Sequence, residues 1–220
     1  GKGWNNSENG INRGMRNETV LQKKWTDYPI IAVDNETSGQ YPINDDLCEI
    51  AAVKSINGEI IDTYQTLVKP REKMSDFIIS IHGITNEMVK GAPLIQDVLP
   101  DFLNFIKEGV VVGHDSHFDL GFLSYEIEKW GHDVPVDPVM CSSLIARNTI
   151  TDTPNHKLQT LIKHLGIDGG QAHRALDDAK ACLELAFHCI KKKKAESFQD
   201  IFSIQGSPLW WNYFSVRGRT

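Results

Sequence analysis

The sequence predicts a mixed α/β domain, in which an antiparallel three-strand meander continues into parallel strands flanked by helices. Residues 30–33 form a β-branched and apolar run of the kind found in a buried strand. Two further β-rich runs, 47–54 and 59–68, are joined through Asn57-Gly58, and Asn-Gly is the strongest short hairpin signal. Downstream, a strand-like run alternates with helical periodicity, which favours a sheet with helices packed on it.

The helical elements follow in order. Residues 75–81 predict a short helix, Thr85 caps another, and a longer helix begins at Pro93 and runs to residue 107. Residues 110–113 predict a second short buried strand, and a helical run then continues to residue 130. Three more helices are expected at 141–147, 158–165 and 175–193.

Length and composition are those of one globular domain with extensions. The chain has 220 residues and 40% hydrophobic content, which is enough for a core. A net charge of −6 argues against a broad basic surface that coats duplex nucleic acid, but clustered metal-binding acids also lower the formal charge. No apolar run reaches the length of a membrane span and no signal-peptide pattern is present, so we expect a cytoplasmic protein without a membrane partner.

Three regions are distinguished along the chain. Residues 1–26 are rich in Gly, Asn and Lys, lack periodicity and are expected to form a flexible lead-in. Residues 27–194 contain the predicted domain. Residues 195–220 form an aromatic-rich extension, for which packing on its own domain, docking on a polymerase or a second copy, and stacking on single-stranded bases are the alternatives. Deletion after Ala195 is expected to preserve catalysis and to lower solubility or stability.

Two acids follow the first strand. Strand periodicity puts Asp34 and Glu36 on one face. At about 4 Å and an effective dielectric constant of about 20, two carboxylates repel by roughly 4 kcal/mol, so a hard cation or a basic partner is expected between them. A turn with solvated acids is the alternative, because Asp and Gly are common at strand ends.

Two further polar clusters accompany them. Residues 114–119 follow the second buried strand, and in such sheets ligands bind beyond the carboxyl ends of the strands. The segment 173–178 opens the last long helix. On one continuous helix, His173 and Asp178 would point roughly 140° apart. Both reach one site only if His173 precedes the helix, and Gly169-Gly170 upstream provides a suitable loop.

Together, the segments 34–39, 114–119 and 173–178 resemble the three motifs of the DEDDh (DnaQ-like) 3′→5′ exonuclease family, in the same order and spacing. Residues 81–85 are similar to the loop that members such as the proofreading epsilon subunit of bacterial DNA polymerase III carry between the first two motifs. Residues 157–166 are similar to the helix before the third. The resemblance covers residues 28–190 and implies a ribonuclease-H-like fold.

The resemblance also implies which residues act. Two divalent metal ions, Mg²⁺ or Mn²⁺, are expected on four acids, which are Asp34, Glu36, Asp119 and Asp178. His173 is the expected general base. The residues expected to hold the terminal nucleotide are Thr37, Ile81, His82 and Phe118.

The implied activity is hydrolysis of single-stranded or frayed DNA 3′ ends to nucleoside 5′-monophosphates, in proofreading or repair. An enzyme that trims RNA 3′ ends is one alternative, because the same site hydrolyses either backbone. A catalytically silent nucleic-acid binding module is another, although all four acids and the histidine are present.

Several charged positions have open interpretations. Asp115 stands where the family usually has Asn, and it is interpreted as a charge that weakens substrate binding, as an extra metal contact, or as an outward-facing helix cap. Arg174 is an ordinary helix-start cation or a phosphate ligand. The lysine run 191–194 complements a helix C-terminus or contacts nucleic acid.

Overall fold

One mixed six-stranded sheet organises the residues that the computed structural model describes, 16–214. The segments 1–15 and 215–220 of the expected lead-in and tail lie outside the described residues. The strand order is β4-β3-β2-β5-β6-β7. The strands are β2 (Ile30–Thr37), β3 (Leu47–Ile56), β4 (Glu59–Leu67), β5 (Val110–Gly113), β6 (Pro138–Cys141) and β7 (Leu209–Trp210).

The pairing of the strands confirms the predicted fold class. Strands β2, β3 and β4 form the antiparallel meander, while β5 runs parallel to β2 and β6 parallel to β5. At the hairpin between β3 and β4, Asn57 and Gly58 have φ values of 52° and 82°. Two consecutive positive φ angles match the twist that a two-residue hairpin requires, which explains why Asn-Gly occurs there.

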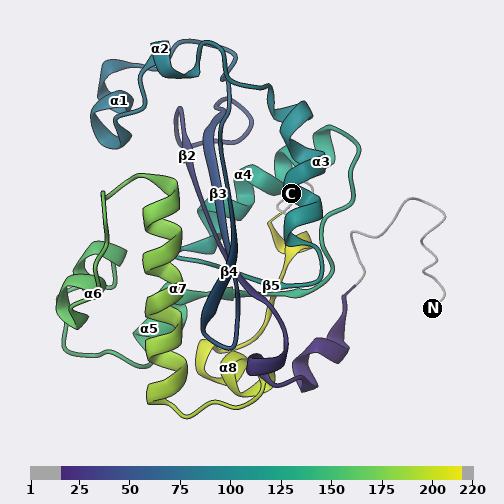
Figure 1. Ribbon diagram of the computed structural model, residues 1–220, viewed down its shortest axis with the longest axis vertical. Coiled ribbons are helices and arrows are strands. Elements are labelled where there is room, and N and C mark those ends of the chain that lie inside the picture. Colours follow the sequence, from purple (N-terminus) through teal and green to yellow (C-terminus); the bar gives the residue numbers. More distant parts are fainter. Residues whose placement is uncertain (1–15, 215–220) are drawn as a thin grey trace.

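Helices lie on both sides of this sheet (Figure 1). They are α1 (Asp76–His82), α2 (Asn86–Val89), α3 (Ile95–Ile106), α4 (Ser116–Lys129), α5 (Ser142–Arg147), α6 (Leu158–Leu165), α7 (Ala175–Lys192) and α8 (Phe198–Gln205). The third of these begins two residues after Pro93, with Leu94 as its N-cap. Among the described helices, none is both long and apolar enough to cross a bilayer.

The central strand β2 presents alternate residues to two cores. Ile30 and Ala32 belong to the core that α7 covers, whereas Ile31 and Val33 belong to the core formed with α3 and α4. Because side chains alternate along a strand, the acidic residues that follow at even positions point to the α7 face. The alternation of apolar residues along β2 therefore places Asp34 and Glu36 on the face of the sheet that α7 covers.

The strand β6 and the elements of the tail were not predicted from the sequence. Helix α8 packs in the same core as α7, with Phe198, Ile201 and Phe202 fully buried. Strand β7 extends the sheet by pairing with β6. The described part of the tail therefore packs on its own domain, and deletion after Ala195 would remove core side chains. Loss of folding, rather than preserved catalysis, is the result that this packing leads us to expect.

The described part of the expected lead-in also contacts the core. It contains two 3-10 helices, η2 (Glu18–Gln22) and η3 (Trp25–Asp27), in which Val20 and Trp25 are buried. The indole Nε1 of Trp25 donates a hydrogen bond to the carbonyl oxygen of Ala195 at 2.9 Å. The segment before the domain is thereby attached to the start of the tail.

We expect Phe202→Ala to destabilise the protein by about 3–5 kcal/mol, because it leaves a cavity in a close-packed core. Tyr213→Ala is the matched control, since Tyr213 is an aromatic residue of the same tail that is 55% exposed. Denaturant unfolding of both variants measures the difference. Equal small losses would contradict the role of the tail in the core.

Candidate active site

Acidic side chains from three elements converge at the end of β2. Asp34 and Glu36 on β2 and Asp178 on α7 each place a carboxylate oxygen within 4.8 Å of the others. Asp119, on the first turn of α4, is 5% exposed, and its carbonyl oxygen accepts a hydrogen bond from Asn35 Nδ2 at 3.1 Å. The fold thus brings together three of the four acids that the sequence analysis selected, and the fourth, Asp119, is close enough for its charge to act on Asp34.

The pKa values of the four acids are all raised, and burial is the largest cause for each of them. Burial is the largest cause that raises the pKa of Asp34 well above its usual range, and the charge of Asp119 is the next. Burial likewise raises the pKa of Asp119. Burial, followed by the charges of Asp178 and Asp119, raises the pKa of Glu36 to about 9. The pKa of Asp178 rises to about 6, again mainly through burial. Such a cluster is stable in its ionised form only with a cation among the carboxylates.

The donor set fits a hard divalent cation. Among the described residues, Asp34 Oδ2 is buried and has no hydrogen-bond partner. A buried carboxylate oxygen without a hydrogen-bond partner destabilises the folded state unless it binds a ligand such as a cation. Carboxylate oxygens are also the ligands that Mg²⁺ and Mn²⁺ prefer.

His173 lies immediately before α7 and not on it. Its φ of 62° is left-handed, which takes the residue out of the helical path, as the angular argument from the sequence requires. The His173 N–H donates a hydrogen bond to Asp178 Oδ2 at 3.1 Å, and Gln159 Nε2 donates to Asp178 Oδ1 at 3.3 Å. The His173 residue is exposed, and it is close enough that its charge lowers the pKa of Asp178.

The four residues expected to hold a nucleotide differ in accessibility. Ile81 and Phe118 are 42% and 41% exposed, so both can meet a ligand. Thr37 is buried, and its hydroxyl donates to the carbonyl oxygen of Gly39 at 2.6 Å.

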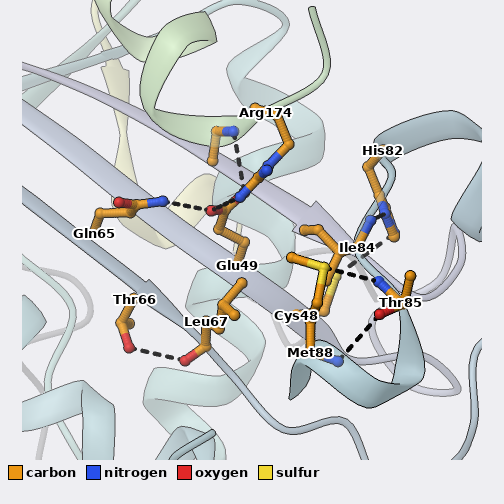
Figure 2. A network of polar contacts seen from close by, with 11 residues as sticks. Cys48, Glu49, Gln65, Thr66, Leu67, His82, Ile84, Thr85, Met88 and Arg174 are labelled. Atoms are coloured by element: carbon orange, nitrogen blue, oxygen red, sulfur yellow. Dashed lines mark hydrogen bonds and ion pairs between the residues drawn. The ribbon is translucent and has the colours of Figure 1, made fainter. Parts of the chain in front are cut away.

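His82 is only 4% exposed and contacts the protein itself. Its Nδ1 accepts a hydrogen bond from the Ile84 N–H at 3.0 Å, and its Nε2 lies 3.7 Å from Cys48 Sγ (Figure 2). Burial lowers the pKa of this imidazole below its usual value. The contacts of His82 anchor the end of α1 to β3, beside the acids.

The second motif is attached to its surroundings through His114. Both ring nitrogens are engaged, Nδ1 with Ser142 Oγ at 2.9 Å and Nε2 with the carbonyl oxygen of His156 at 2.7 Å. The next residue, Asp115, is exposed and occupies the N-cap position of α4 with φ 59°, but its side chain makes no capping hydrogen bond. Its charge contributes to the raised pKa of Asp119.

Sequence reasoning missed Glu49, a fully buried acid on β3. It pairs directly opposite Glu36 in the register of β2 and β3, and it forms an ion pair of 3.1 Å with Arg174. Figure 2 shows this network, to which Gln65 also contributes. The available signal was a single acid within the apolar run 47–53.

A mixed α/β sheet with an acid cluster at the end of its central strand is an arrangement suited to a metal-dependent hydrolase. Residues 31–186 match the family model RNase_T, whose description is exonuclease. The chain belongs to this exonuclease family, and its enzyme class is nuclease, which confirms the resemblance drawn from the sequence.

Curated relatives and solved structures agree with this assignment. The DNA polymerase III PolC-type protein of Caldanaerobacter subterraneus subsp. tengcongensis is 37% identical over 174 residues, which are 79% of this chain and 12% of that protein. The PolC-type protein of Clostridium perfringens is 39% identical over 166 residues, 76% of this chain and 11% of that protein. The chain therefore spans only about an eighth of the length of these relatives.

Two solved structures support the fold. Exonuclease X in complex with 5′ overhanging duplex DNA is 25% identical with a TM-score of 0.61, and the match covers 80% of this chain and 99% of that one. E. coli exonuclease I in complex with a dT13 oligonucleotide has a TM-score of 0.69 at 16% identity, over 76% of this chain and 42% of that one. The latter likeness concerns the fold alone. The ribonuclease-H-like architecture expected from the sequence is confirmed.

The raised pKa of Glu36 leads to a prediction for the metal-free protein. Between its ordinary pKa of 4.5 and about 9, the folded state holds a proton that the unfolded state has released, so the free energy of unfolding falls as the pH rises. Because a divalent cation binds the ionised carboxylates, Mg²⁺ should raise the unfolding midpoint more at pH 8.5 than at pH 5. Thermal unfolding in EDTA and in Mg²⁺ measures this. An equal shift at both pH values would contradict it, and Glu36→Gln should weaken the dependence.

Proposed function

We propose that this chain removes nucleotides from the 3′ end of single-stranded or frayed DNA and releases nucleoside 5′-monophosphates. The observation that carries the proposal is the convergence of Asp34, Glu36 and Asp178 on one point, with Asp119 and His173 beside them. Four carboxylates can hold two divalent ions for the hydrolysis of a phosphodiester, and an imidazole can take the proton of the attacking water.

Two divalent ions, Mg²⁺ or Mn²⁺, would be held by the four acids, which are Asp34, Glu36, Asp119 and Asp178. When bound, they supply Lewis-acid stabilisation of the attacking and leaving oxygens. The unpartnered Oδ2 of Asp34 and the raised pKa values of the cluster support this fit.

The residues of this chain supply the remaining steps. His173, on an exposed loop next to Asp178, takes the proton of the attacking water. The exposed side chains of Ile81 and Phe118 contact the terminal nucleotide, while the buried Thr37 and His82 shape the wall behind it. An unpaired end suits such a site, because extracting a paired nucleotide costs a few kcal/mol.

The choice of DNA rests on the relatives. The PolC-type relatives are DNA polymerases by name, and Exonuclease X is described with duplex DNA. We therefore infer a proofreading role beside a polymerase, in a cytoplasmic protein whose exonuclease domain, expected at residues 27–194, also includes the packed tail. Trimming of RNA 3′ ends is the second candidate, since no described contact distinguishes the two sugars.

One assay tests the proposal. DNA labelled at its 5′ end, offered as single strand, mismatched end and blunt duplex, is incubated with Mg²⁺, Mn²⁺ or EDTA, beside RNA of the same sequence. The expected result is a ladder of shortened DNA that requires metal and forms fastest from unpaired ends. Faster cleavage of RNA would favour the second candidate. Binding without cleavage under every metal condition would indicate a silent binding module.

A further inference from the structure

A buried glutamate on β3, Glu49, accepts hydrogen bonds from the start of α7. Glu49 Oε1 accepts hydrogen bonds from Arg174 Nε at 3.3 Å and from the backbone N–H of Ala175 at 3.2 Å. Its Oε2 accepts from Arg174 Nη2 at 3.1 Å and from Gln65 Nε2 at 2.7 Å (Figure 2). The side chain of Glu49 is completely removed from solvent.

These four contacts exclude Glu49 from binding a metal. An ionised carboxylate offers about four lone-pair sites, two on each oxygen. Each oxygen of Glu49 already accepts two hydrogen bonds, so no site remains for a cation. Glu49 therefore differs from Asp34, whose Oδ2 has no partner among the described residues.

One of these contacts satisfies a free backbone N–H group at the N-terminus of α7. The N-cap residue, Arg174, makes no capping hydrogen bond with its side chain, although the first N–H groups of a helix need acceptors. Glu49 provides an acceptor for the first of them, at Ala175, and a negative charge at the positive end of the helix dipole. The cap is thus supplied from another strand.

We propose that Glu49 is a positioning residue, which caps α7 from β3 and fixes the catalytic turn of α7 against the acids of β2. Asp178 lies in the first turn of α7, and His173 directly precedes the capped residues. Glu36 lies opposite Glu49 in the strand register. Glu49 therefore connects the two elements that bear the acids. The inference rests on the proposed function of this site.

Glu49→Gln tests this role in the full chain. A glutamine amide keeps one acceptor oxygen but turns a donor toward the donors of Arg174 or Gln65, so the cap is incomplete. We expect kcat to fall by about 10–100-fold, since a displacement of about 1 Å can cost that much. The KM for the oligonucleotide should stay unchanged, and the amides of the first turn of α7 should exchange hydrogen faster.

Glu126→Gln is the matched control. Glu126 is a second buried glutamate, on α4, where Oε1 accepts a hydrogen bond from Trp130 Nε1 at 3.1 Å. This control should keep the wild-type kcat and should show no faster exchange in α7. The double variant Glu49→Gln/Arg174→Met removes both partners, and it should lose less kcat than the two single changes multiplied together predict.

The possible results distinguish failure of the positioning role of Glu49 from failure of the proposed exonuclease function. Wild-type kcat in folded Glu49→Gln, unchanged exchange in the first turn of α7, or an equal loss of kcat in Glu126→Gln would overturn the positioning role. A wild-type protein that cleaves no substrate with any metal would count against the proposed function instead. The exchange measurement would still decide whether Glu49 caps α7.

Discussion

Replacing Asp34 by asparagine is expected to reduce cleavage to the level seen in EDTA while making the metal-free protein more stable. The two effects have one cause. Burial is the largest cause that disfavours the ionised form of Asp34, and the charges of Asp119, Glu36 and Asp178 add to it. The neutral amide removes this repulsion but no longer provides a carboxylate ligand. The measurements are the cleavage rate in Mg²⁺ and the unfolding midpoint in EDTA, where each 1 kcal/mol gained shifts the midpoint by about 2–4 °C.

Asp177→Asn is the control for this change. Asp177 lies next to a proposed ligand in the sequence, but its Oδ2 accepts a hydrogen bond from the Gln171 N–H at 2.8 Å. We expect cleavage by this variant to remain within a few-fold of wild type. A folded Asp34→Asn protein with normal turnover would disprove the assignment of Asp34 as a ligand.

His173→Ala is expected to lower kcat by about 10²–10⁴-fold, because it removes proton transfer from the attacking water. Metal binding and substrate binding should be retained, since the hydrogen bond from this residue to Asp178 comes from its backbone N–H. Single-turnover rates measure the chemical step, and oligonucleotide binding in Ca²⁺ measures substrate binding without cleavage. His164→Ala is the control, because His164 lies on helix α6 and its Nε2 is 3.3 Å from Asp152 Oδ1. A loss of less than about 5-fold in His173→Ala would exclude it as the base.

Local signals allowed part of the fold to be predicted. The strand β2 and the hairpin between β3 and β4 follow from an apolar run and from Asn57-Gly58, which act over a few residues. Strand β6 has four residues, begins with Pro138 and shows no alternation, so only its neighbours β5 and β7 make it a strand. Its existence depends on contacts between distant segments, which periodicity does not report.

The residues of the site also fall into those that local motifs indicate and those that depend on distant contacts. The four acids could be selected because each lies within one of the three motifs that resemble the DEDDh family. The helical angle between His173 and Asp178 required a loop before α7. Glu49 was missed because its partner Arg174 is 125 residues away. The burial of His82 was also not predictable, because no local pattern indicates which way a helix-terminal side chain turns, and its expected place beside the substrate stays a prediction.

The pairing of Glu49 with Arg174 has a consequence for electroneutrality. This ion pair is neutral as a unit, so it contributes nothing to the charge that the remaining acids must balance. Asp34, Glu36, Asp119 and Asp178 together carry four negative charges when ionised. One divalent ion would leave two of these charges in front of an arriving phosphodiester, whereas two ions cancel them. The proposed two ions would therefore match the charge of these four acids, because the charge of Arg174 is already paired with Glu49.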